Sequence, residues 1–444
     1  MYRIAMTPIV DFVKKYAKEN KTRFHMPGHK GVPFLGLEPL DITEIDGADD
    51  LYHADGIILE SENNAASLFG TSRTVYVTGG STQSIQAMLF TAYQRADKAC
   101  NPYILAGRNA HKAFIYGVAK LGVDVQWLYP ENNNGICSCN ISAEKIDEVL
   151  SSSSTKPFAV YITSPDYLGG MADIKGISAI CRKHGIPLLV DNAHGAYLAF
   201  CKENLHPINL GADLCCDSAH KTLPVLTGGG YLHCAKSDLY GFADKIKAAT
   251  AIFGSTSPSY LVMQSLDLCN RYIDEKIRED IVFAESRTAE IRKAMQEKGI
   301  EEISVEPLKI TARYPDAEYF RAMGIEPEYA DGEFVSFMAS SFNSEEDFER
   351  LRTAFENITS CKTNVKSGIG FVKPERAVPI REAMFAESEM VDIEKAKDRI
   401  CAAPTVSCPP AIPIAVSGER ITDEHITAFK AYSINRIAVI KAEI

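Results

Sequence analysis

Short apolar runs alternate with stretches long enough to form helices between residue 62 and about residue 220. Each run has the length and the apolar composition of a buried strand. The predicted strands cover residues 74–77, 103–106, 125–129, 159–163, 187–190 and 213–216. Because strands that alternate with helices build parallel sheets with both faces covered, the sequence predicts an α/β fold with a mostly parallel sheet.

The chain on either side of this region has a different character. The polar N-terminal segment contains an expected helix with Thr7 as N-cap and Pro8 at the first helical position. The other expected elements are a helix over 259–298, strands over 302–312 and 333–339, and helices over 345–357 and 422–441. We therefore expect an N-terminal arm (1–60), a large domain (61–300) and a smaller C-terminal α/β domain (301–444).

Composition excludes several classes of protein. With 46% hydrophobic and 24% charged residues, the chain is typical of a globular protein and not of a disordered or fibrous one. The 47 basic residues are outnumbered by 58 acidic ones and form no run, which argues against a nucleic-acid partner. No long apolar stretch or signal peptide is present, so we expect no membrane span and a cytoplasmic location. The twelve cysteines form no CxxC pair and are expected to be reduced.

Reactive or glycine-rich segments follow four of the predicted strands, at the edge where open parallel sheets bind ligands. These segments are TGGST (78–82), RNAHK (108–112), DNAHG (191–195) and DSAHKT (217–222). Taken singly, they are compatible with a tight turn, a structural histidine or a helix cap. Together they offer a helix N-terminus for a phosphate, a flat ring for stacking, a carboxylate and an amine. This is the set of groups that pyridoxal phosphate requires.

Eight motifs connect the sequence to a known family. They are FHMPGHKG (24–31), DITEIDGADDLYHADG (41–56), GGSTQS (79–84), RNAHKA (108–113), DNAHGA (191–196), SAHKTLP (218–224), STSPSY (255–260) and REAMFAESE (381–389). On these motifs the sequence resembles the Orn/Lys/Arg decarboxylase family over nearly its whole length, in the short bacterial form without an N-terminal wing domain. The resemblance implies a fold-type I, aspartate aminotransferase-like enzyme that depends on pyridoxal phosphate and uses no metal.

The resemblance implies a role for individual residues around the cofactor ring. Lys221 is expected to bind the cofactor aldehyde as a Schiff base, and Asp191 to pair with the ring nitrogen. His111 is expected to stack on the ring, and His194 to lie near the reacting carbon. The arm residues His25, His29 and Lys30 are expected to close over the substrate, although a Gly/Pro-rich surface loop is the simpler interpretation of that segment.

The resemblance also implies how the phosphate is held. The residues expected to hold it within one subunit are Gly80, Ser81, Thr82, Ser218 and His220. Thr256 or Ser257 is expected to reach the phosphate of a partner subunit, so the active form is a homodimer or a higher homo-oligomer with its sites at the interface.

The expected reaction is decarboxylation of a basic L-amino acid (arginine, lysine or ornithine) to the corresponding polyamine-pathway amine. Carboxylates that could bind the distal charge of such a substrate are Asp46, Asp49, Asp50, Asp55, Glu387 and Glu419. Asn192, where family members often carry Glu, and CPPAIP (408–413), where many have a PYPPGIP-like stretch, leave the substrate open. The alternatives are an aminotransferase or lyase, for which Arg376, Arg381 and Arg420 could bind a carboxylate, and a non-catalytic regulator.

Overall fold

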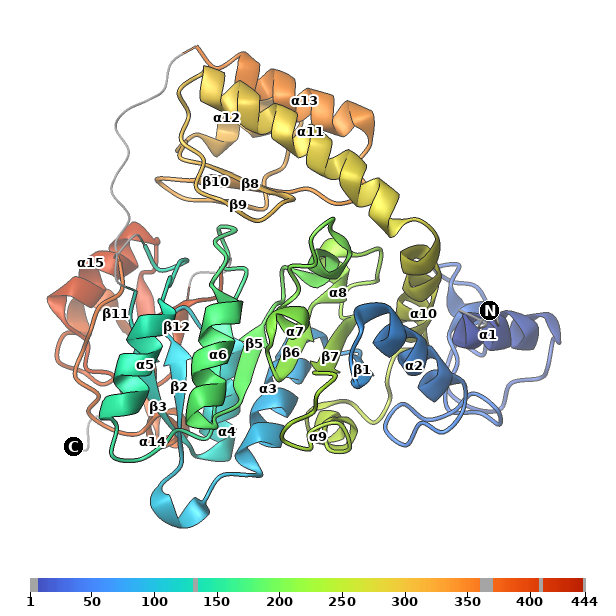
Figure 1. Ribbon diagram of the computed structural model, residues 1–444, viewed down its shortest axis with the longest axis horizontal. Helices are drawn as coiled ribbons and strands as arrows, with labels where there is room; N and C mark the ends of the chain where they lie inside the picture. Colours follow the sequence, from blue (N-terminus) through green and yellow to red (C-terminus); the bar gives the residue numbers. More distant parts are fainter. Residues whose placement is uncertain (1–6, 131–134, 360–369, 407–409, 442–444) are drawn as a thin grey trace. The chain divides into compact units, whose positions relative to one another are not determined.

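The computed structural model describes residues 7–130, 135–359, 370–406 and 410–441 (Figure 1). The chain divides into two compact units, unit 1 with residues 1–94 and 187–282, and unit 2 with residues 95–186 and 283–444. Seven strands form one sheet in the order β1-β7-β6-β5-β4-β2-β3. The pairs β5–β6, β2–β4 and β2–β3 are parallel, whereas β7 runs antiparallel to both of its neighbours. The sheet is therefore mostly parallel, which confirms the predicted fold class.

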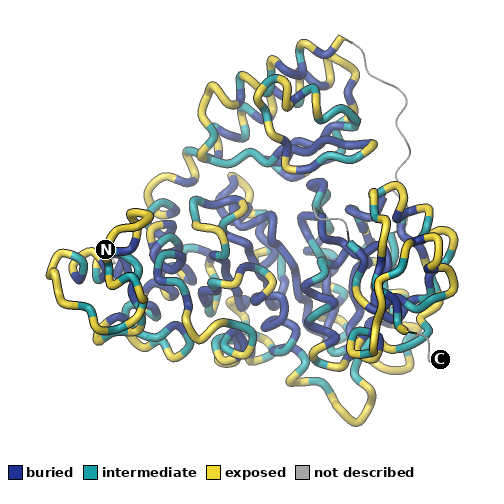
Figure 2. Tube along the Cα trace, turned by 180° about the vertical axis from the view of Figure 1, so that it is seen from behind, coloured by how far each residue is buried: buried dark blue, intermediate teal, exposed yellow. Residues whose placement is uncertain are grey.

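Unit 1 carries four strands and most of the predicted site. Its strands are β1 (Arg73–Val77), β5 (Leu188–Asp191), β6 (Leu214–Asp217) and β7 (Gly230–Cys234). Its helices are α1 (Pro8–Lys18), α2 (Ile57–Phe69), α3 (Gly80–Tyr93), α7 (Pro207–Leu210), α8 (Ala219–Thr222), α9 (Ile246–Phe253) and α10 (Tyr260–Glu275). The strands are buried along almost their whole length (Figure 2), because helices such as α2 and α3 cover them.

Unit 2 contains the other three strands of the large sheet and several smaller elements. The strands are β2 (Tyr103–Gly107), β3 (Asp124–Leu128), β4 (Val160–Thr163), β8 (Lys309–Ala312), β9 (Tyr329–Ala330), β10 (Val335–Met338), β11 (Ser388–Asp392), β12 (Thr405–Val406), β13 (Pro413–Ala415) and β14 (Arg436–Ile440). The helices are α4 (Lys112–Leu121), α5 (Ala143–Ser152), α6 (Ile174–His184), α12 (Ala317–Ala322), α13 (Glu345–Glu356), α14 (Ile380–Phe385) and α15 (Asp423–Ala431). Helix α11 (Ile277–Glu297) begins in unit 1 and ends in unit 2.

The sequence located the six expected strands of the large sheet to within one residue at each end. It missed β7, a short strand that begins at the last of three consecutive glycines. The helix expected over 259–298 is two helices, α10 and α11, and the strand expected over 302–312 is shortened to β8. The prediction of one helix over 422–441 is wrong for the second half of that range. Helix α15 ends near Ser433, which has a φ of 56°, and the alternating residues of β14 then pair antiparallel with β11.

Three further expectations concern the described residues. Thr7 stands at the N-cap position of α1, but its hydroxyl donates to Asp11 Oδ2 at 3.3 Å and caps no backbone N–H. The ten cysteines in the described ranges are all free, and Cys100 is the one of them that is exposed. No helix in the described part of the chain is long and apolar enough to cross a bilayer. The expected domain boundaries at residues 60 and 300 remain predictions.

Candidate active site

Lys221 contacts a histidine of its own unit, unit 1. It lies in the short helix α8, which directly follows β6, and its Nζ is 3.0 Å from Nε2 of His194. His194 is buried and belongs to a tight turn in which the N–H of Gly195 donates to the carbonyl of Asn192 at 2.9 Å. The sequence placed these two residues after different strands, and the structure brings the amine and the imidazole together.

Asp191 is the last residue of β5 and is only 2% exposed. Its Oδ1 accepts a hydrogen bond from the N–H of Ala193 at 3.2 Å and from the thiol of Cys216 at 3.6 Å. Burial, together with the nearby Asp191 charge, raises the pKa of Cys216 well above its ordinary value, so the thiol keeps its proton and remains a donor. The carboxylate is thus held at a strand end in the same unit as Lys221.

The start of helix α3 forms the expected anion site. Gly80 is its first residue, with a φ of +65° that favours glycine, and its N–H donates to Gly228 O at 2.7 Å. The N-cap residue, Gly79, has no side chain that could accept from the N–H groups of the first turn, which leaves the positive end of the helix available to an anion. Ser81 is half-buried and Thr82 is exposed in the first turn.

Ser218 and His220 follow directly after β6. The Oγ of Ser218 is buried and has no hydrogen-bond partner among the described residues. The Cε1 of His220 lies 3.7 Å from the position that a Cβ on Gly80 would occupy. Nδ1 of His220 donates to the carbonyl of Gly229 at 2.9 Å, and burial lowers the pKa of its imidazole. An orphaned hydroxyl at Ser218 and a helix start next to His220 both fit the phosphate of the expected cofactor.

Gln83 is a site-forming residue that the sequence reasoning missed. Its Oε1 accepts from the N–H of Gly79 at 3.0 Å, and its Nε2 donates to the carbonyl of Thr250 at 2.9 Å and to Tyr52 Oη at 3.3 Å. It therefore ties the glycine loop to α9 and to the acidic segment. A Cβ at residue 254 would overlap the Tyr52 hydroxyl, so Gly254 is needed for this approach. A buried glutamine in a helix gives no signal in one sequence.

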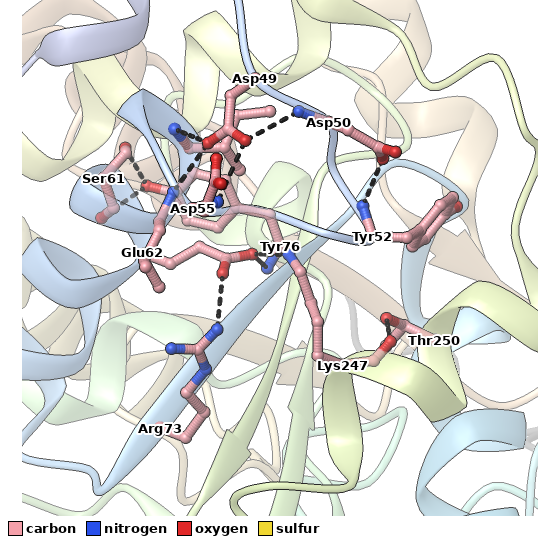
Figure 3. Close-up of polar contacts among 12 residues, drawn as sticks. Asp49, Asp50, Tyr52, Asp55, Ser61, Glu62, Arg73, Tyr76, Lys247 and Thr250 are labelled. Atoms are coloured by element: carbon pink, nitrogen blue, oxygen red, sulfur yellow. Dashed lines mark hydrogen bonds and ion pairs between the residues drawn. The ribbon is translucent and has the colours of Figure 1, made fainter.

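The acidic segment 41–56 is largely structural (Figure 3). The Asp49 carboxylate accepts from the N–H groups of Gly56 and Ile58, both at 2.9 Å, and so caps the start of α2. Asp50 pairs with His53 at 3.0 Å. Nearby, the fully buried Glu62 binds Lys247 at 2.5 Å. Asp49 and Asp50, both considered for the distal charge of a substrate, thus already have partners.

His111 belongs to unit 2 and is the N-cap of α4. Its Nδ1 accepts from the N–H of Ala113 at 3.1 Å, which fixes the ring. Arg108, just before it, is 1% exposed and donates to the carbonyl of Pro413 at 2.7 Å and to Glu419 at 3.4 Å. This buried pair anchors the loop after β2 to the 413–419 segment. Glu419, considered for the distal charge of a substrate, thus already has a partner. The first part of CPPAIP, including Cys408 and Pro409, lies outside the described residues.

The remaining predicted site residues lie in two loops of unit 1. In the arm, His25 Nε2 contacts Tyr16 Oη at 2.7 Å, His29 Nε2 contacts Asp41 Oδ2 at 3.2 Å, and Lys30 Nζ donates to the carbonyl of His25 at 2.5 Å. Thr256 and Ser257 lie between α9 and α10, and both are exposed.

The comparisons with known proteins decide the family. The sequence model of the "Orn/Lys/Arg decarboxylase, major domain" matches residues 7–327, and that of the "Orn/Lys/Arg decarboxylase, C-terminal domain" matches residues 370–434. The chain belongs to the Orn/Lys/Arg decarboxylase family. It is therefore an amino-acid decarboxylase that depends on pyridoxal phosphate, and the orphaned Ser218 hydroxyl, the uncapped start of α3 and the Lys221 amine fit that cofactor.

Relatives match this decarboxylase over most of their length. An uncharacterized protein of Bacillus subtilis is 29% identical, covering 95% of this chain and 93% of its own. The arginine decarboxylase of the same organism is 26% identical over 95% of this chain and 92% of its own. A lysine decarboxylase structure from Francisella novicida has a TM-score of 0.79 at 18% identity, covering 98% of this chain and 81% of its own. That structural likeness supports the fold-type I architecture.

Proposed function

We propose that the chain decarboxylates a basic L-amino acid, namely arginine, lysine or ornithine, and releases the corresponding polyamine-pathway amine. The observation that carries the proposal is the contact of the Lys221 amine with His194 in the unit where Asp191 ends a buried strand. Arginine decarboxylases that are 26% identical over more than nine-tenths of this chain support the basic substrate.

Each residue of this group has a distinct task. Lys221 provides the amine that attaches the cofactor, and His194 exchanges a proton at Nε2 with that amine or with the reacting carbon. Asp191 supplies the negative charge that keeps the ring nitrogen protonated. When bound, pyridoxal phosphate supplies the sink for the electron pair left at Cα when carbon dioxide departs. His111, held as a helix cap in unit 2, presents a fixed imidazole for stacking on the ring.

The phosphate is assigned to the start of α3. We propose that Ser81, Thr82 and the backbone at Gly80 bind it, and that the Ser218 hydroxyl gains there the partner that it lacks. We propose that His220, held by its Nδ1 hydrogen bond to Gly229, lines the same site.

We assign two roles to the arm, contact with the substrate and contact with a second subunit. His25, His29 and Lys30 are proposed to close over the substrate. Phe24 is 93% exposed and Phe34 is 92% exposed, and large apolar groups that project in this way favour a partner surface. We propose a homodimer in which the exposed Thr256 or Ser257 reaches the phosphate of the partner subunit. Asp46 and Asp55, both exposed in the acidic segment, remain candidates for the distal charge.

The aminotransferase alternative has less support from the arginines of unit 2. Arg376 pairs with Asp124 at 3.2 Å, and Arg420 pairs with Glu375 at 3.0 Å. Arg381 donates to the carbonyl of Lys120 at 2.8 Å. Each of the three arginines considered as a carboxylate clamp is therefore engaged elsewhere.

A product assay tests the proposal. The purified protein, supplied with pyridoxal phosphate, is incubated with arginine, lysine or ornithine, and carbon dioxide, amine and keto acid are measured. We expect equal amounts of carbon dioxide and amine from at least one substrate and no keto acid. Lys221→Ala should lose turnover and the absorbance band of covalently held cofactor, whereas Lys236→Ala, at an exposed lysine of the same unit, should retain both. Keto acid as the main product, or wild-type turnover by Lys221→Ala, would refute the proposal.

A further inference from the structure

A fully buried polar cluster lies at the ends of the strands that carry the proposed site. It consists of Asn192, His206, Asp217 and His233, all 0% exposed and all in unit 1; we call it the Asp217 cluster. Asp217 Oδ1 accepts from Asn192 Nδ2 at 2.7 Å. Asp217 Oδ2 lies 3.0 Å from His206 Nε2 and 3.2 Å from His233 Nε2. None of these four side chains is assigned to the cofactor or to the substrate.

The hydrogen-bond directions in the cluster follow from its outer contacts. Nδ1 of His206 accepts the N–H of Ile208 at 3.4 Å, so Nε2 of a neutral ring carries the hydrogen and donates to Asp217. Nε2 of His233 faces the same carboxylate oxygen, which can only accept, so Nε2 donates and Nδ1 of the neutral ring accepts from the Thr74 hydroxyl at 2.8 Å. Burial by itself would raise the pKa of Asp217, but the two imidazoles hold it well below its ordinary value. Asp217 is therefore an anion with three N–H donors.

The same residues resemble a metal site, since single ligand atoms of His206, Asp217 and His233 lie within 4.8 Å of one another. A metal needs the lone pair of each imidazole nitrogen. At His206 that lone pair is at Nδ1, which faces the Ile208 N–H, and Nε2 presents a hydrogen to Asp217. The two imidazoles and the carboxylate thus already have hydrogen-bond partners, and a metal would have to disrupt these bonds.

The position of the cluster in the sequence connects it to the reaction. Asp217 directly precedes the segment that carries Ser218 and Lys221, and Asn192 directly follows Asp191. The carbonyl of Asn192 also closes the turn that carries His194. The Asn192–Asp217 hydrogen bond therefore joins the two segments whose side chains, Lys221 and His194, meet at 3.0 Å.

The cluster does not face the same side of the sheet as Asp191. Residues alternate in direction along a strand, and Asp191 contacts Cys216 whereas Asn192 contacts Asp217, its next neighbour in register. The side chains of Asn192 and Asp217 are consequently directed to the face of the sheet opposite that of Asp191.

We propose that Asn192 and Asp217 are positioning residues, whose buried hydrogen bond sets Lys221 against His194 and holds Asp191 at its strand end. The proposal rests on the roles proposed above for those three residues. His206 and His233 hold Oδ2 of Asp217 in place, so that Oδ1 is directed at Asn192. A displacement of about 1 Å between reacting groups can lower a rate by about 10²-fold, so a single bond at this point can matter.

The test compares Asn192→Ala with Asn270→Ala. Asn270 is a matched control: it is also 0% exposed in unit 1, it donates through Nδ2 to Tyr76 Oη at 2.8 Å, and its Oδ1, like that of Asn192, has no partner among the described residues. Both variants lose a buried amide and should melt at a lower temperature. We expect Asn192→Ala alone to lower kcat about tenfold, with KM changed less than threefold, and to shift the pH midpoint of the cofactor absorbance.

The outcomes separate the possible roles. If Asn192→Ala matches Asn270→Ala in kcat and in the absorbance titration, the positioning role is refuted while the proposed decarboxylation stands. If Lys221→Ala retains turnover, the proposed function itself fails. Should Asn192→Ala not fold, ¹⁵N NMR of the histidine rings in the wild-type holoenzyme still tests the cluster. Protonated Nε2 atoms at His206 and His233 support the hydrogen-bonded cluster on which the positioning role depends. A stoichiometric bound metal with unprotonated Nε2 atoms overturns both.

Discussion

Two regions of unit 1 carry residues of the proposed site, and they are built in opposite ways. The turn 191–195 is buried throughout and the segment 217–222 is buried except at His220 and Lys221, and hydrogen bonds such as Asn192–Asp217 fix them from within. Within the N-terminal arm, the loop 21–37 exposes Phe24, Phe34 and Leu35 by 84% or more. The first region is preorganised by its own subunit, whereas the second has a surface that its own unit leaves uncovered.

The loop 21–37 is nevertheless anchored on both sides. Before it, the N–H of Val10 in α1 donates to Asp267 Oδ2 at 2.9 Å, and Asp267 Oδ1 accepts from Ser61 at 2.5 Å. After it, Gln264 Nε2 donates to the carbonyl of Leu40 at 2.9 Å. Helix α10 therefore holds both ends, and the segment between them can adapt to what covers it.

Removal of the charge at residue 191 should produce the largest effect in the buried region. We expect Asp191→Ala to bind pyridoxal phosphate but to lower kcat by about 10³-fold, because one preorganised charge is lost. Steady-state kinetics on enzyme saturated with cofactor measure this. Cys216→Ala removes a thiol donor to Asp191 and keeps the charge, so it should cost less than about tenfold. An equal loss in both variants would mean that packing at the strand end, and not charge, is what matters.

The fastening of α1 should depend on pH. Burial raises the pKa of Asp267 to about 7, so the folded protein keeps a proton that the unfolded chain releases near pH 4. The free energy of unfolding should therefore fall as the pH rises from about 4 to about 7, by at most about 4 kcal/mol, and then become level. In Asp267→Asn this contribution should be absent. Urea denaturation at a series of pH values measures it, with Asp274→Asn, at an exposed position of the same helix, as the control.

A polar residue at the tip of the arm should weaken self-association without unfolding the subunit. Burial of one phenylalanine contributes about 2 kcal/mol, and a homodimer of the variant loses two of them, so Phe34→Ser should raise the dimer dissociation constant by up to about 10³-fold. Sedimentation equilibrium measures the constant, and the melting curve of the monomer should be unchanged. Phe342→Ser, at a residue of unit 2 that is 63% exposed, is the control. If the two variants associate like the wild type, the arm is not part of the interface.

The sequence predicted the residues of the buried region better than the contacts that hold them in place. Strand ends follow from apolar runs, so the run pattern alone places Asp191 and Lys221 at one sheet edge. It does not indicate the contacts that hold them, because Gln83, Asn192 and Asp217 act through partners that are distant in the sequence. The sequence of the acidic segment is compatible with carboxylates for a substrate or with a solvated turn, and the helix-capping role of Asp49 depends on a φ of 69° at that residue, which no local pattern indicates.

The smallest expected effect concerns Gln83, which connects the buried glycine loop to the segment that follows the arm. Gln83→Ala removes the bond to the Gly79 N–H and those to Thr250 and Tyr52, so the loop loses its fixed shape. We expect about a tenfold weaker affinity for pyridoxal phosphate, the cost of roughly one net hydrogen bond, with kcat at saturating cofactor nearly unchanged. Gln94→Ala, at the exposed C-terminal end of the same helix, should bind the cofactor like the wild type. A fall in kcat without a loss of affinity would instead place Gln83 with the residues that orient Lys221, and would extend the rigid region as far as residue 52.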